Sequence, residues 1–153
     1  VESAIEEAMR DRYFEVRREA CHAIDQLPLL ARKGWAGEAI EEALGDRSFE
    51  VRIAAVKGLS RSHGHLRGVP LLRRFYMDAN WQLRHAVLEA FERWGHQGDE
   101  CTRGLLRTEM DGILLTADGY KPSFGLKEKV NAVRGALATS EVPGPAPEGE
   151  TRQ

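Results

Sequence analysis

The sequence predicts an all-α solenoid, in which helical hairpins stack side by side, and three observations lead to this fold class. A segment that reads DRSFEVRIAAVKGL from Asp46 recurs as DRYFEVRREACHAI from Asp11 and as DANWQLRHAVLEAF from Asp78. Apolar residues within each copy recur at spacings of three and four, which is typical of amphipathic helices. One helical pair cannot bury its apolar stripe alone, so consecutive units are expected to stack against each other.

The three copies agree position by position. They are anchored on Val16, Val51 and Leu83, which stand 35 and then 32 residues apart. An aspartate precedes each anchor by five positions, an aromatic residue precedes it by two, and an arginine follows it directly. The members of these columns are Asp11, Asp46 and Asp78; Phe14, Phe49 and Trp81; and Arg17, Arg52 and Arg84. Agreement at so many positions identifies an internal repeat.

Each unit is predicted to contain two helices. The first is short and amphipathic, as in residues 36–44, and the second begins near the aromatic residue. Ser48 and Asn80 stand at the expected N-cap positions, and Asp11 can substitute for the poorer cap Tyr13. On the second helix, the anchor and the positions 3, 4, 7 and 8 residues after it form the apolar stripe. Small residues in this stripe allow neighbouring helices to approach closely.

The repeat pattern also predicts the domain organisation. Residues 1–140 are expected to form one repeat domain, with repeats at about 1–27, 36–60 and 69–95. After Gly95 the register fails, and 98–140 is expected to be an irregular C-terminal pair of capping helices with a loop or β-hairpin at 111–124, around Asp118-Gly119. This part either caps the stack as a degenerate fourth repeat or reaches a partner. The Pro/Gly-rich residues 141–153 are predicted to be a disordered tail.

The repeated segments resemble the HEAT repeat family, specifically the short bacterial type that also occurs in phycobilisome-lyase-like proteins. The resemblance covers roughly residues 1–96 and implies an α-solenoid. It also implies a structural ladder between neighbouring repeats, built from Asp11, Asp46, Asp78, Arg17, Arg52 and Arg84. A proline that is common at the start of the family's second helix is replaced here by the aromatic column. The resemblance leaves the function open, because the family includes scaffolds, lyases and nucleic-acid enzymes.

Catalytic patterns are missing from the sequence, so we expect a protein that is not an enzyme. There is no glycine-rich phosphate loop and no GxSxG motif. Cys21 and Cys101 match no metal or redox spacing, which indicates free thiols. His85 and Glu89 share a helix face and His22 could lie near them, but HEAT-like hydroxylases use His-Glu dipeptides, which this chain lacks. We therefore expect no metal and no cofactor.

The variable positions of the second helices favour a role in binding another protein. On a solenoid, functional residues usually lie on the concave face that the second helices build. We expect a partner segment to lie along this face and to contact Arg18, His22, Ile53, Lys57, His85 and Glu89. The column formed by Cys21, Val56 and Leu88 is expected to pack between repeats instead. A rigid, preformed surface lowers the ordering cost of binding.

The charge distribution supports one alternative. From Val51 to Met77 the chain has six arginines and lysines and no acid, although its formal net charge is −2. A basic patch of Arg61, Arg67, Arg73 and Arg74 could bind phosphoanions or nucleic acid, unless acids of neighbouring repeats neutralise it. Glu89 and Glu92 on the second-helix face count against extended DNA binding. The family resemblance leaves a further alternative, a lyase-like enzyme or an accessory subunit of one.

The sequence also suggests a location. It contains no run of about 18 apolar residues, so no membrane-spanning helix and no membrane partner are expected. The first residues are acidic and amphipathic, unlike a signal peptide, and the cysteine usage is typical of a reducing compartment. We therefore expect a cytoplasmic protein. If further repeats precede Val1, Ile5 and Met9 would contact an N-terminal neighbour.

Overall fold

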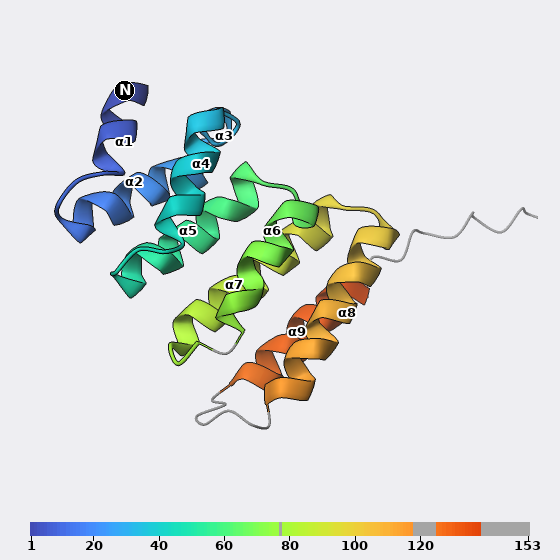
Figure 1. The fold of residues 1–153 in the computed structure, drawn as a ribbon. Helices are drawn as coiled ribbons and strands as arrows, with labels where there is room; N and C mark the ends of the chain where they lie inside the picture. Colours follow the sequence, from blue (N-terminus) through green and yellow to red (C-terminus); the bar gives the residue numbers. More distant parts are fainter. Residues whose placement is uncertain (77, 118–124, 139–153) are drawn as a thin grey trace, which may run out of the picture.

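The computed structural model describes residues 1–76, 78–117 and 125–138, and it confirms the predicted all-α solenoid. The helices follow one another from α1 at one end to the α8–α9 pair at the other (Figure 1). They are α1 (Glu2–Ala8), α2 (Phe14–Gln26), α3 (Pro28–Ala31), α4 (Gly34–Ala43), α5 (Phe49–Ser62), α6 (His65–Leu72), the short 3₁₀ helix η1 (Arg73–Phe75), α7 (Trp81–Gln97), α8 (Glu100–Ala117) and α9 (Leu126–Ala138). The residues so described include no strand.

The helices form two layers. In one layer α2, α5, α7 and α9 pack consecutively against one another as the second helices of four hairpins. The other layer contains the first helices α1, α4, α6 and α8 (Figure 1). Leu59, Leu72 and Phe91 are completely buried in the core that the layers share. The column of Cys21, Val56 and Leu88 is buried as expected. We call the outward side of the α2–α5–α7–α9 layer the second-helix face.

The last hairpin is more regular than the sequence suggests. Helix α8 continues without interruption to Ala117, so the loop or β-hairpin predicted at 111–124 is wrong over residues 111–117. Met110 and Ile113 are buried on the side of α8 that packs against α9. The apolar residues of this segment favour a strand in isolation, but packing against α9 buries them as part of a helix. The turn predicted at Asp118-Gly119 and the tail at 141–153 lie outside the described residues.

The recurring aspartates shape the turn between the two helices of a hairpin. Asp11, Asp46 and Asp78 each accept a hydrogen bond at 2.8 Å from the backbone N–H two residues later. An arginine of the following helix closes the same turn. Arg17 Nη1 donates to the Asp11 carbonyl at 2.8 Å, and Arg52 Nη1 donates to the Asp46 carbonyl at 2.7 Å. The aspartate and arginine columns therefore act within a hairpin, where their side chains form hydrogen bonds with backbone groups of the turn.

The predicted N-caps differ in how they work. The Asn80 side chain accepts hydrogen bonds from Gln82 N at 2.9 Å and Leu83 N at 3.2 Å, so it caps α7 directly. Ser48 occupies the N-cap position of α5, but its side chain makes no capping hydrogen bond. The aspartate turn, rather than a serine cap, therefore introduces α5.

Close contact between the layers depends on a glycine. A Cβ atom at Gly68 in α6 would lie 2.2 Å from Cη2 of Trp94 in α7. The Trp94 ring has little room to move, because its N–H donates to the His63 carbonyl at 2.9 Å. A Cβ atom at Gly104 in α8, by contrast, would meet no heavy atom within 4 Å.

We predict that Gly68→Ala destabilises the protein by about 1–3 kcal/mol, because the methyl group overpacks the Trp94 contact. The matched control Gly104→Ala should stabilise it by up to about 1 kcal/mol, since alanine favours a helix over glycine. Urea unfolding followed by circular dichroism measures both changes. Equal stability of the two variants would show that the α6–α7 approach is not this close.

Candidate functional site

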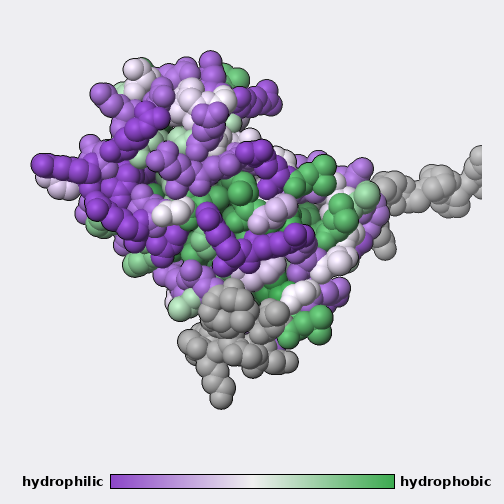
Figure 2. All heavy atoms as spheres, viewed as in Figure 1, coloured by the Kyte–Doolittle hydropathy of each residue, from purple (hydrophilic) through white to green (hydrophobic). Residues whose placement is uncertain are grey.

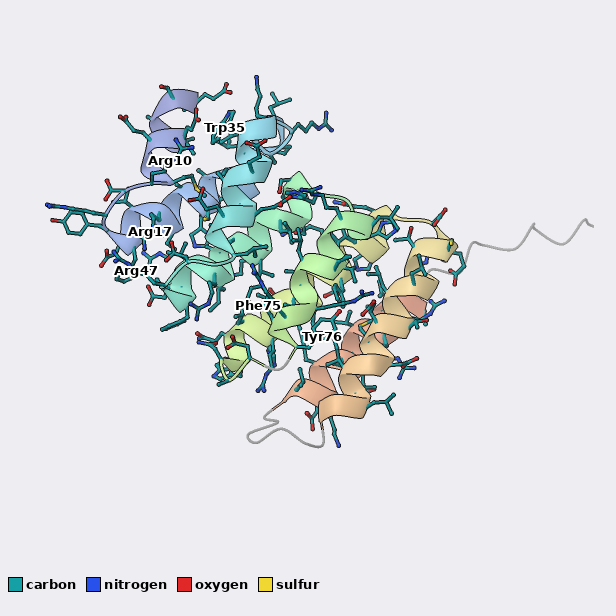
Figure 3. All side chains as sticks on the ribbon, in the orientation of Figure 1. Arg10, Arg17, Trp35, Arg47, Phe75 and Tyr76 are labelled. Carbon is teal, nitrogen blue, oxygen red and sulfur yellow. The ribbon has the colours of Figure 1, made fainter. Side chains whose placement is uncertain are left out.

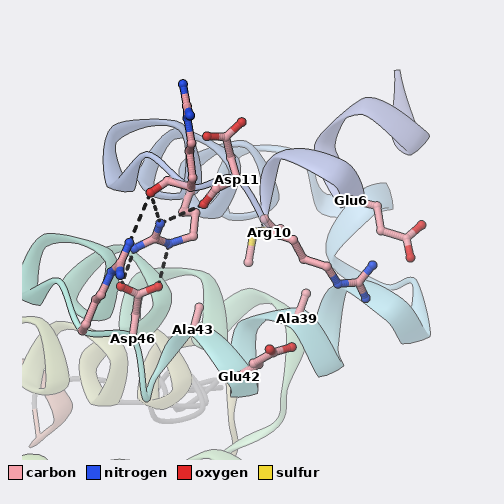
Figure 4. Close-up of a pocket in the computed structure, with 11 residues that line it drawn as sticks. Glu6, Arg10, Asp11, Ala39, Glu42, Ala43 and Asp46 are labelled. Carbon is pink, nitrogen blue, oxygen red and sulfur yellow. Dashed lines mark hydrogen bonds and ion pairs between the residues drawn. The ribbon is translucent and has the colours of Figure 1, made fainter.

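One rung of the predicted ladder joins the first two hairpins. Arg17 Nε and Nη2 donate to the two carboxylate oxygens of Asp46 at 2.8 and 2.9 Å (Figure 4). Both side chains are largely buried. Burial raises the pKa of the Asp46 carboxyl, but hydrogen bonds from Arg17 and from the Ser48 amide outweigh it and hold this pKa below its ordinary value. A bidentate, charge-assisted pair of this kind fixes the register of neighbouring repeats.

Arg52 and Asp78, the next predicted pair of the ladder, do not repeat this rung. No ion pair in the described part of the chain joins Arg52 to Asp78, and Arg52 stays within its own turn. Arg84 is buried at the start of α7. A second link between the first two hairpins comes instead from Arg18, whose Nη1 lies 3.2 Å from Glu50 Oε2.

The basic segment does not form a patch of uncompensated charge. Three of its four predicted arginines pair with carboxylates on other helices: Arg61 with Asp25 at 3.7 Å, Arg67 with Glu41 at 2.6 Å, and Arg73 with Glu109. The fourth, Arg74, lies over the Phe75 ring. The acids of neighbouring hairpins therefore pair with three of the six cations that the sequence concentrates between Val51 and Met77.

The structure brings part of the predicted partner-binding set together at a pocket of about 230 Å³ on the second-helix face. Residues of α2, α5 and α7 line this pocket: Asp25, Lys57, Ser60, Ala86, Glu89, Ala90 and Arg93. Two of these, Lys57 and Glu89, belong to the predicted set. The small side chains of Ala86 and Ala90 leave the room that the pocket occupies.

Arg93 holds the three helices of the pocket together. Its Nη1 donates to Asp25 Oδ1 at 2.7 Å, to Ser60 Oγ at 2.7 Å and to the Lys57 carbonyl at 3.2 Å. Arg93 was not predicted from the sequence, because the repeat register places the preceding residue, Glu92, on this face. The only sequence signal was that Asp25 and Ser60 occupy the same column and, as polar groups near the core, need a partner.

Lys57 supplies the second cation of the pocket, beside Arg93. Within residues 1–76, 78–117 and 125–138, its ammonium group makes no hydrogen bond or ion pair. The acids around it are compensated, since Asp25 pairs with Arg93 and Glu89 lies 3.7 Å from Lys129 on α9. The pocket therefore offers an ammonium group to an incoming acceptor.

The remaining predicted contact residues lie on the same helices but outside the pocket lining. Arg18 is held by Glu19 and Glu50. His22 on α2 and Ile53 on α5 are half-buried. His85 on α7 packs edge-on against the Trp81 ring, with 5.2 Å between the ring centroids. Burial, with a smaller contribution from the Lys129 charge, lowers the pKa of His85 below its ordinary value.

Possible metal ligands do not cluster in the described residues, and one of the two thiols is deeply buried. No three histidine, cysteine, aspartate or glutamate side chains among them come together as metal ligands. Burial raises the pKa of the Cys21 thiol to about 12, so this thiol stays protonated at neutral pH. Cys101 is exposed.

Ser62, His63 and Glu41 form a hydrogen-bonded chain that sequence reasoning also missed. Ser62 Oγ lies 2.8 Å from His63 Nδ1, and His63 Nε2 lies 2.8 Å from Glu41 Oε1. The Ser62 hydroxyl also contacts the Gly58 carbonyl at 3.1 Å, and a carbonyl can only accept its proton. The hydroxyl proton can go to His63 Nδ1 or to this carbonyl, and the hydrogen-bonded chain joins α4 to the end of α5.

A larger pocket of about 580 Å³ lies between the α1–α2 turn and α4 (Figure 4). Its arginines do not converge on one point. Arg10 extends toward Glu6, whereas Arg17 and Arg47 lie together at the turn ends of the hairpins (Figures 3 and 4). Arg12 is held against the Tyr13 ring. This arrangement does not form a site for one anion.

An apolar groove lies on the opposite, first-helix side of the molecule. Hydrophobic surface gathers there over α6 and α8 (Figure 2). The groove has a volume of about 200 Å³, and Leu66, Val69, Leu105 and Leu106 are among the residues that line it. Leu66 and Leu105 are exposed. This groove was not predicted from the sequence, because it arises where two hairpins meet.

We predict that Arg17→Gln lowers the free energy of unfolding by about 2–4 kcal/mol, because it leaves the Asp46 carboxylate buried without its cation. The neighbouring variant Arg18→Gln is the control and should cost less than about 1 kcal/mol, since its ion pairs are exposed. Urea unfolding at pH 7 measures both. A similar loss of unfolding free energy in the two variants would show that the bidentate Arg17–Asp46 pair contributes no more than the ion pairs of Arg18.

We also predict that His85 makes the protein less stable in mild acid. Its pKa is lower in the folded than in the unfolded chain, so the unfolded chain binds more protons as the pH falls below the ordinary histidine range. The stability that neutral His85 contributes is therefore complete at neutral pH, and it is lost as the pH falls toward the pKa of His85 in the folded chain. Urea midpoints measured at pH 7.5 and 5.5 should show that the unmodified chain loses more stability between these two pH values than His85→Gln does. An identical pH dependence would contradict this assignment.

Comparisons with known proteins agree with the fold. A family model for HEAT repeats matches residues 1–92. No curated protein and no solved structure gives a significant match. No helix in the described part of the chain combines the length and the apolar character needed to cross a membrane. The repeats in residues 1–92 make this chain a member of the HEAT repeat family, whose repeats commonly mediate protein–protein interaction.

Proposed function

We propose that the protein is a non-catalytic interaction module that binds a segment of a partner protein along its second-helix face. The observation that carries this proposal is the pocket between α2, α5 and α7, where the Lys57 ammonium has no partner in the described part of the chain. The proposed contact residues are Arg18, His22, Ile53, Lys57, His85 and Glu89, with Arg93 as the residue that holds the pocket in shape.

Rigidity supports this role. The Arg93 hydrogen bonds join α2, α5 and α7, and the Arg17–Asp46 and Arg18–Glu50 pairs fix α2 relative to α5. A surface that is already ordered loses little conformational entropy on binding, so modest contacts suffice for useful affinity. We also propose a cytoplasmic location, because both cysteines are free thiols and Cys101 is exposed.

The nucleic-acid alternative has less support. Binding to phosphates needs several uncompensated cations on one surface. Arg61, Arg67 and Arg73 each pair with a carboxylate, and they belong to α5, α6 and η1. We therefore keep protein binding as the proposed function.

Selection of random 12-residue peptides displayed on phage, with the full chain as bait, tests the proposal. Affinities of the selected peptides for purified variants are then measured by fluorescence anisotropy. Lys57→Glu should weaken binding about 10-fold or more, because it replaces the pocket cation by a repelling charge. The matched variant Lys33→Glu makes the same change at the N-terminus of α4, in the first-helix layer, and should change binding less than about 2-fold.

Two results would overturn the proposal. One is the failure to select any peptide that binds. The other is a set of peptides whose binding Lys57→Glu leaves intact while Leu105→Glu, in the apolar groove between α6 and α8, abolishes it. That second result would move the binding site to the first-helix side of the molecule.

A further inference from the structure

Two aromatic side chains lie exposed on the second-helix face, near the pocket that contains Lys57. Phe49 begins α5 and is 43% exposed, and Trp81 begins α7 and is 51% exposed. Residues four apart share one side of a helix, so Phe49 and Ile53 lie on the side of α5 that carries Lys57. We call Phe49 and Trp81 the aromatic pair. Aromatic side chains are enriched in binding surfaces, because each offers a large apolar area to a partner.

Helix α7 repeats this arrangement beside α5. Trp81, His85 and Glu89 follow one another at spacings of four, and the edge-on contact between the Trp81 and His85 rings shows that these two side chains share one side of α7. Helices α5 and α7 pack against each other and begin at the same end of their layer (Figure 1). The aromatic pair therefore adds an apolar area to the face on which Lys57 and Glu89 line the pocket.

The pocket suits a single negative charge. Within the described part of the chain, the Lys57 ammonium forms no hydrogen bond or ion pair, and Arg93 uses only Nη1 for its hydrogen bonds. Ammonium and guanidinium groups form their strongest hydrogen bonds with anionic oxygens. The carboxylates of Asp25 and Glu89 line the same pocket, and half of the Glu89 side chain is exposed. Their repulsion disfavours a group with two negative charges, such as a phosphate.

We propose that the second-helix face recognises a linear segment of another protein in which an aspartate or glutamate stands near an apolar residue. The acidic side chain enters the pocket and pairs with Lys57, and the apolar side chain lies against the aromatic pair. This inference rests on the proposed function and adds to it the chemical class of the bound segment.

The spacing within the segment follows from helix geometry. Ile53 and Phe49 precede Lys57 by four and eight residues, which correspond to about 6 and about 12 Å along α5. An extended chain rises about 3.3 Å per residue. The acidic and apolar residues of the segment are therefore about two to four positions apart.

The sequences of the phage-selected peptides give the first test. We expect most of them to contain an aspartate or glutamate with a large apolar residue two to four positions away. In one such peptide, replacing the acid by the corresponding amide should weaken binding about 10-fold in fluorescence anisotropy, because the ion pair with Lys57 is lost. Replacing its apolar residue by serine should weaken binding by a similar factor.

Protein variants then assign each peptide residue to its contact. Lys57→Gln should weaken binding of the acidic peptide about 10-fold and change binding of the amide peptide less than about 2-fold, because only the acidic peptide has a charge to pair. The control Lys33→Gln, in the first-helix layer, should change neither. Trp81→Ala should weaken both peptides by the same factor and leave the preference for the acid unchanged. Circular dichroism checks that each variant is folded.

The outcomes separate this inference from the proposed function. Peptides that Lys57→Glu weakens, but whose acids can be replaced by amides without loss of affinity, would overturn the inference and leave the proposed function standing. Tighter binding of a peptide with phosphoserine in place of the acid would overturn the assignment of a carboxylate. Sedimentation that shows a dimer which Lys57→Gln dissociates would make a second copy the occupant and would also overturn the inference. Failure to select any peptide would remove the proposed function itself.

Discussion

The burial of each second helix against the next is the constraint on which this structure depends. A completely buried aliphatic side chain contributes about 1.5–3 kcal/mol, and Val51, Leu59 and Leu83 are completely buried in the core that the stacked hairpins share. Small residues make the approach possible. A Cβ atom at Gly58, for example, would lie 2.7 Å from Ile40 Cδ1 and 3.5 Å from the Cys21 carbonyl of the neighbouring α2. The hairpins are therefore stable as a stack rather than as separate units.

The polar interactions have a narrower role, which is to choose one register for the stack. The aspartate turns place each second helix relative to its first helix, and the Arg17–Asp46 pair then places one hairpin relative to the next. Breaking such a pair is costly, although its net contribution relative to an apolar contact is small. Arg93 has the same role at the opposite end of the helices, where its hydrogen bonds join α2, α5 and α7.

Sequence periodicity predicted the features that follow from local repetition and missed those that arise where hairpins meet. The anchors Val51 and Leu83 are buried as the stripe requires, but Val16 matches them in sequence and is exposed because its position in the stack differs. The apolar residues near the end of α8 favour a strand by themselves, and packing against α9 makes them helical. The pocket around Lys57 could be predicted in part, because the repeat register places Lys57 on the second-helix face. Arg93 could not be predicted, because no local pattern indicates its contact with Asp25, which is 68 residues away in the sequence.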